Sequence, residues 1–173
     1  IMTSSFFGQI KSDIDGEGDH DNSSRSAVSI NSSGDRVAIG AWKNDGNGFN
    51  AGHVRVYDLV NGSWTQVGED IDGEAANDGS GVSVSMNSSG DRVAIGGYGN
   101  DGNGVDAGYV RLYDLVNGSW TQLGSDIDGE AAGDFSGGSV SLSSNGSVVA
   151  IGASFNDGSN GFDSGHVLSL IHI

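Results

Sequence analysis

The stretch SGDRVAIG at residues 33–40 recurs without change at residues 89–96, a shift of 56 residues. The ten-residue stretch YDLVNGSWTQ at 57–66 recurs at the same shift, at 113–122. A weaker third copy keeps VAIG at 149–152. Long identical runs at a fixed spacing are typical of repeat proteins, in which each unit covers the exposed face of its neighbour. We therefore predict a repeated fold rather than a disordered chain.

Apolar and polar residues alternate inside each unit, which is typical of half-buried strands. The first unit shows this alternation three times, at Val28 and Ile30, at Val37 and Ile39, and at Val54 and Val56. A fourth strand is expected to run from Trp64 to Ile71. No stretch keeps its apolar residues at the helical spacing i, i+3, i+4, i+7 over three turns, so we predict no helix.

Turn residues separate these predicted strands and complete the fold prediction. Asn61-Gly62 and Asn117-Gly118 supply the pair of positive φ angles that a type I′ hairpin requires. With a hairpin at every link, each unit forms a four-stranded antiparallel meander. One such sheet cannot bury its own face, and radial stacking of several gives a β-propeller. The predicted fold is all-β, a β-propeller fragment of about three four-stranded antiparallel meander blades.

The repeat also predicts how a single partial propeller is divided along the chain. We expect residues 1–25 to hold the last strand of a preceding blade and a linker. Blades at 26–81 and 82–137 follow, and then a partial blade at 138–167. The remaining blades of a parent chain would cover the two ends. Residues 168–173 depart from the repeat, and we expect an artefactual tail without function.

Composition limits the classes of partner. The chain has 23 acidic and 7 basic residues, a formal net charge of −16, which argues against nucleic acids and anionic membranes because both attract a cationic surface. It has no cysteine, which excludes disulfides, thiol catalysis and cysteine zinc sites. No apolar run approaches the ~18 residues of a membrane helix, so we expect no membrane insertion.

Three stretches in the third copy resemble the FG-GAP repeat of integrin-α-type propellers, in its bacterial and protist variant. They are GDFSGGSVSL at 133–142, VAIGA at 149–153 and SGHV at 164–167. The FG element falls at 135–137, and the GAP element at 152–154 and at the equivalent places in the other copies, without its proline. The resemblance implies an extracellular or cell-surface binding and adhesion module, with a protein or glycan ligand held by propeller loops.

Acidic residues suggest Ca²⁺ as the one possible cofactor, because this ion takes six to eight oxygen ligands. Many members of the family carry calcium in the first hairpin, but here that turn reads NSSGD at 31–35 and 87–91 and SSNGS at 143–147, so we do not expect calcium there. Instead the candidates lie in the linkers and the long loops: Asp13, Asp15, Glu17, Asp70, Asp72, Glu74, Asp78, Asp126, Asp128, Glu130, Asp134, Asp45, Asp101 and Asp106. The alternative is that these residues form solvated acidic linkers and wide turns.

The sequence offers no catalytic constellation. His53, Tyr109 and His166 share one repeat position, so we expect them on different blades, on the surface of the third strand, and not in one metal site. Trp64 and Trp120 are expected to pack between sheets, as is Phe7. The predicted function is therefore a non-enzymatic FG-GAP-type adhesion module. The alternatives are a calcium-stabilised structural repeat of a larger secreted protein and, less favoured, a propeller enzyme with paired carboxylates.

Overall fold

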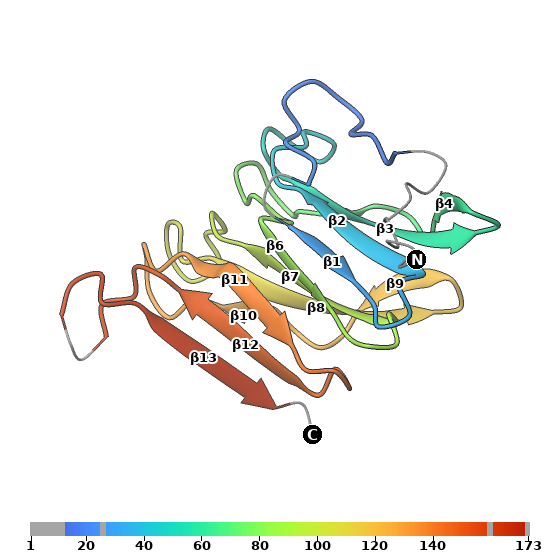
Figure 1. Ribbon diagram of the computed structural model, residues 1–173. Coiled ribbons are helices and arrows are strands. Elements are labelled where there is room, and N and C mark those ends of the chain that lie inside the picture. Colours follow the sequence, from blue (N-terminus) through green and yellow to red (C-terminus); the bar gives the residue numbers. More distant parts are fainter. Residues whose placement is uncertain (1–12, 25–26, 159–160, 172–173) are drawn as a thin grey trace, which may run out of the picture.

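The computed structural model describes residues 13–24, 27–158 and 161–171, which form three antiparallel sheets that lie side by side (Figure 1). The described residues contain no helix, as the apolar alternation predicts. The first sheet contains β1 (Val28–Ile30), β2 (Arg36–Ala41), β3 (His53–Val60), β4 (Ser63–Gln66) and β5 (Ile71–Asp72).

The second sheet repeats the first and the third sheet is shorter. The second contains β6 (Ser83–Met86), β7 (Arg92–Gly97), β8 (Tyr109–Val116), β9 (Ser119–Gln122) and β10 (Ile127–Asp128). The third contains β11 (Ser136–Leu142), β12 (Val148–Ala153) and β13 (His166–Ile171). The predicted all-β, antiparallel architecture is thus confirmed, and the described sheets do not close into a barrel.

The strands of each sheet follow one another as a meander, with one departure from the prediction. The predicted fourth strand, residues 64–71, is divided into β4 and β5, and both pair with β3. Gly68 lies in the break with a φ of 74°, a conformation that cannot continue an extended strand. The β3–β4 hairpin matches its prediction, because Asn61 and Gly62 both have positive φ, 52° and 80°.

Two apolar cores lie between the sheets, one at each junction. At the first junction Val54 and Val56 of β3 pack against Val93 and Ile95 of β7. Trp120 packs against the same core, as predicted for this position, whereas Phe7 lies outside the described residues. Alternation along the strands therefore gives the second sheet one face toward the first sheet and one toward the third.

The second junction repeats the first and includes part of the expected tail. Val110 and Leu112 of β8 pack against Leu142, Val149 and Ile151 of the third sheet, and Leu168 and Leu170 pack against this cluster. Residues 168–171 therefore continue β13 instead of leaving the sheet. The strand predicted near residues 7–10 lies outside the described residues.

Candidate functional site

Two buried or half-buried arginines hold several of the predicted calcium ligands. Arg55 of β3 forms ion pairs with Glu17 and with Asp70, the latter at 2.9 Å. Arg111 of β8, at the equivalent position, pairs with Glu74 and, at 2.8 Å, with Asp126. Each arginine thus joins a linker carboxylate to a carboxylate just before the last short strand of its own sheet. These four acids serve as partners of guanidinium groups.

The arginines favour the ionised form of Asp70 and Asp126. Burial opposes the ionisation of Asp126, but hydrogen bonds from Arg111 and Gln122 outweigh it and lower its pKa. Asp70 behaves alike, because burial is outweighed by hydrogen bonds from Arg55 and Gln66, and its pKa is also lowered. Asp72 has no such donor, so burial and the nearby Asp70 charge raise its pKa.

Asp78 and Asp134 are buried and close the turns of the linkers. The Asp78 carboxylate accepts hydrogen bonds from the backbone N–H groups of Glu74 and Ala75. Asp134 accepts one from Ala131 N–H at 2.9 Å, and another from the side-chain amide of Asn156. Carboxylates that accept backbone donors in this way fix the course of a loop.

Asp45 and Asp101 organise the long loops that follow β2 and β7. Asp45 accepts a hydrogen bond from Asn50 N–H at 2.7 Å, and Asp101 accepts one from Asp106 N–H at 2.9 Å. Asn50 and Asp106 both have positive φ, as expected of wide turns. The remaining predicted ligands lie at the surface: Asp13, Asp15, Asp72, Asp128 and Glu130.

One group of described residues has metal-ligand chemistry. Donor atoms of Glu17, His53 and Asp70 all lie within 4.8 Å of one another. Arg55 pairs with both carboxylates of this group, so a cation placed there would face a guanidinium charge. The 14 predicted ligands are therefore distributed over linkers and loops, and calcium binding stays a prediction.

The expectation that His53 and Tyr109 lie on the surface is wrong. Both side chains are buried, Tyr109 between the first and second sheets and His53 beneath linker residues 14–17 and 23. Arg111 lies 4.4 Å from the centre of the Tyr109 ring. Burial raises the pKa of Tyr109. In the sequence the position shares a strand face with Arg55 or Arg111, two residues further on, and a charged neighbour suggests a solvated face. His166, only partly buried, lies 3.7 Å from Glu130.

A row of four aromatic rings crosses the loop ends of all three sheets, and we call Trp42, Tyr98, Phe135 and Phe155 the aromatic row. Ring centres are 6.0 Å apart between Trp42 and Tyr98, 5.8 Å between Tyr98 and Phe135, and 5.2 Å between Phe135 and Phe155. The loops between β2 and β3, β7 and β8, and β12 and β13 project from this same end (Figure 1).

The aromatic row is accessible and is bordered by polar groups. Trp42, Tyr98 and Phe135 are partly exposed, and Phe155 is exposed. Burial raises the pKa of Tyr98, and the charge of Asp106 adds to the effect, which places this carboxylate near the phenol. Lys43 lies over the Trp42 ring with its ammonium 4.8 Å from the ring centre. Partly exposed aromatic rings beside a few polar groups are a common feature of small-molecule sites.

Sequence reasoning did not identify this row. Trp42 and Tyr98 occupy one repeat position, which is a detectable signal. The third copy has Ser154 at that position, and Phe155 follows it. Phe135 comes from a linker, so only the folded arrangement brings the four rings together.

Comparisons with known proteins give a match of fold alone. No family model and no curated protein matches the chain. Solved structures do match, among them a "putative 6-phosphogluconolactonase" from Bacteroides uniformis, with a TM-score of 0.52 and 12% identity. The alignment covers 83% of this chain and 39% of the Bacteroides chain, so this chain spans well under half of that protein's length.

This likeness contradicts the expectation of a non-enzymatic adhesion module, and with it the alternative of a calcium-stabilised structural repeat. The matched fold occurs in a protein that carries an enzyme's name rather than in an adhesion protein. Short motifs misled the functional prediction because they mark the turns and strand ends that a stacked meander sheet requires, and so report the fold more than the activity. Membership of the FG-GAP family and an extracellular location stay predictions.

The described residues include no helix long and apolar enough to cross a membrane.

Proposed function

We propose that this chain contributes the sugar-binding surface of a carbohydrate-acting protein with a lactonase-like fold, and that the aromatic row binds the sugar ring. The observation that carries the proposal is the row itself, four rings in succession across three sheets. The fold likeness to a protein named as a lactonase supports it at the level of fold.

The chemistry of the row suits a sugar. Aromatic faces pack against the C–H groups of a sugar ring, while neighbouring oxygens accept hydrogen bonds from its hydroxyl groups. Asp106 lies near Tyr98 and is partly exposed, so it can accept such bonds. Phe49, Val105 and Phe162 add exposed apolar groups on the three long loops beside the row.

The charges favour an uncharged sugar over a phosphorylated one. Arg36, Arg55, Arg92 and Arg111 are all paired with carboxylates. Among the described residues this leaves Lys43, which lies over the Trp42 ring. Since the whole chain has a net charge of −16, a phosphate would meet repulsion with one nearby cation to offset it.

Calorimetric titration with gluconolactone and with its phosphorylated form tests this proposal. We expect the uncharged lactone to bind more tightly than the phosphorylated one. Tyr98→Ala and Phe155→Ala should each weaken binding about three- to tenfold, the range that an aromatic contact contributes. The same samples should be assayed for lactone hydrolysis above the rate in buffer.

Val116→Ala is the control, because Val116 is an exposed apolar residue at the β8–β9 hairpin, at the other end of the strands from the row. This variant should bind like the unmodified chain. Tighter binding of the phosphorylated lactone, or equal binding by the control and the two row variants, would contradict the assignment of the row as the sugar site.

A further inference from the structure

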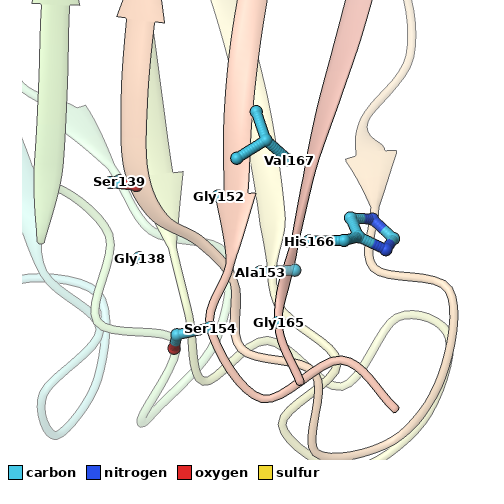
Figure 2. Close-up of a pocket in the computed structure, with 8 residues that line it drawn as sticks. All are labelled: Gly138, Ser139, Gly152, Ala153, Ser154, Gly165, His166 and Val167. Carbon is cyan, nitrogen blue, oxygen red and sulfur yellow. The ribbon is translucent and has the colours of Figure 1, made fainter. Parts of the chain in front are cut away.

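The outward face of the third sheet is open where the equivalent faces of the other two sheets are covered. We call it the tail face. Val54 and Val110, which point toward the next sheet, are both 0% exposed, whereas Val167 at the same repeat position is 72% exposed. Val167 stands over a hollow of about 490 Å³ beside Gly152 and Ser139, and His166 points to the other side of β13 (Figure 2).

The outward face of the first sheet is open at β1, and we call this part the head face. Over β3 the same side of the sheet is covered by linker residues 14–17 and 23, where Glu17 pairs with Arg55. Met86 of β6 is 7% exposed and Leu142 of β11 is 9% exposed, because each packs against the preceding sheet. Ile30 of β1 occupies the same position and is 55% exposed. Val28, next to it on this face, is equally exposed. Exposed apolar patches on otherwise polar surfaces mark docking sites.

The two junctions inside the molecule show what fits these faces. At the first junction Met86 N–H donates to Ser29 Oγ, and at the second Leu142 N–H donates to Ser85 Oγ, both at 2.9 Å. Ser141, at the same position on the third sheet, is exposed. The matching donor on the head face is the N–H group of Ile30.

A second repeated contact joins the hairpins beside each junction. Ser32 N–H donates to Ser88 O at 3.1 Å, and Ser88 N–H donates to Ser144 O at 2.9 Å. The next donor in this series is Ser144 N–H, and its matching acceptor is Ser32 O of another first sheet. The tail face thus presents the exposed valine and the two serine groups that meet the next sheet at both internal junctions.

We propose that the tail face of one copy of this chain docks onto the head face of a second copy, and that this contact continues the internal sheet junctions. The contact is heterologous, so it builds a closed ring or an open series according to its rotation. Several internal contacts are missing from it. Ile71 and Ile127 belong to the two internal cores, and Val67 O accepts a hydrogen bond from Trp120, but the described third sheet has no counterpart of these residues. Arg36 and Arg92 donate to Gly90 O and Gly146 O of the next sheet, whereas the third sheet has Val148 in their place.

Two properties of the association follow from its missing contacts and from the charge of each copy. It is weaker than the internal junctions, so it depends on protein concentration in the micromolar to millimolar range. It also strengthens with salt, because each copy has a net charge of −16 and screening reduces their repulsion. Sedimentation velocity at salt concentrations from about 0.01 M to about 0.5 M measures both effects.

A mixing experiment tests the heterologous geometry. Ile30→Asp blocks the head face and Val167→Asp blocks the tail face, so each variant alone should remain monomeric. An equimolar mixture should form a one-to-one dimer, because one variant keeps an intact tail face and the other an intact head face. Val116→Asp, the same change at an exposed valine in the β8–β9 hairpin, should associate like the unmodified chain.

Different results would overturn the choice of partner and the head-to-tail geometry. A monomeric unmodified chain at every concentration and salt level would exclude a second copy as the partner of these faces. Self-association of either single variant, or a mixture that stays monomeric, would exclude the head-to-tail arrangement. Circular dichroism and urea unfolding show that each variant is folded, and sugar binding at the aromatic row is measured separately on the same samples.

Discussion

At the scale of single residues, Arg111 shows how charge is used between the sheets. Its side chain is buried, and it pairs with Glu74 and Asp126. Replacement by leucine, the residue that the third sheet has at this position as Leu168, leaves both carboxylates without their partner. We expect Arg111→Leu to lower the free energy of unfolding by about 2 to 4 kcal/mol, as for other buried pairs that lose one member.

Urea unfolding followed by circular dichroism measures this loss. Arg55→Leu, at the equivalent and more exposed position of the first sheet, is the matched control and should lose less. Combining Arg111→Leu with Glu74→Gln and Asp126→Asn should recover part of the loss. An Arg111→Leu variant as stable as the unmodified chain would show that the pair contributes nothing to folding.

The same carboxylates give the fold a predictable dependence on pH. Asp70 and Asp126 have lowered pKa values in the folded chain, so their stabilising contribution is complete above about pH 4, the ordinary range for aspartate. It is lost as the pH falls through their folded pKa values. Asp72, with a raised pKa, acts in the opposite sense and favours folding slightly more when protonated.

Urea midpoints measured between about pH 7 and pH 3 test this dependence. We expect the midpoint to fall steeply below about pH 4. Asp126→Asn should be less stable at neutral pH and should show a shallower fall, because it lacks one of the titrating groups. A midpoint that stays constant down to the lowest pH would rule out an ion-pair contribution.

The sequence could not separate these ion pairs from a calcium site. Glu74 and Asp126 have the residue type and surroundings of cation ligands, and the arginine that binds them lies on another part of the chain. Which carboxylates share one arginine depends on sheet stacking, so neither spacing nor composition reveals it. Turn chemistry was predictable at the same scale, because Asn61-Gly62 has one favoured hairpin conformation.

At the scale of elements, the strands follow from apolar alternation, but their close approach follows from glycine. Gly96 of β7 faces Gly137 of the next sheet, and a Cβ atom added to Gly96 would lie 2.0 Å from Gly137 O and 2.4 Å from Ser83 Oγ. Gly96→Ala must therefore displace backbone at the second junction. We expect a loss of about 1 to 3 kcal/mol, the range for overpacked cores.

Gly152→Ala is the matched control, because Gly152 has the same position on the third sheet. Its added Cβ would meet Ser139 Oγ at 2.3 Å, and this oxygen lies on a rotatable side chain. We expect less than about 1 kcal/mol of destabilisation in the urea assay. Equal losses at the two positions would mean that the approach of Gly137 does not constrain the second junction.

At the scale of the whole molecule, stacking was predictable from the repeat, whereas the surfaces it buries were not. A sheet with one apolar and one mixed face must be covered, and identical repeats make the neighbour the natural cover. His53 and Tyr109 looked exposed because their environment comes from a linker and from another sheet. The candidate site could not be predicted for the same reason, because the aromatic row forms only when stacking aligns the loop ends of the three sheets.

Because each sheet is stabilised by its neighbours, the effect of a substitution depends on which junction it occupies. Val110→Ala removes two methyl groups from the second core and should cost about 1 to 2.5 kcal/mol. Val167→Ala, the same change at the open tail face, should cost less than about 0.5 kcal/mol in dilute protein. Urea unfolding at low concentration compares the two variants.

The dependence of unfolding free energy on protein concentration shows whether a second copy covers Val167. If a second copy covers the tail face, the unmodified chain gains stability as its concentration rises, since association stabilises the folded state by mass action. Val167→Ala should lose part of that gain, and Val116→Ala, at the exposed β8–β9 hairpin, should keep it. Parallel curves for all three proteins would mean that Val167 is a free surface residue and that no second copy covers it.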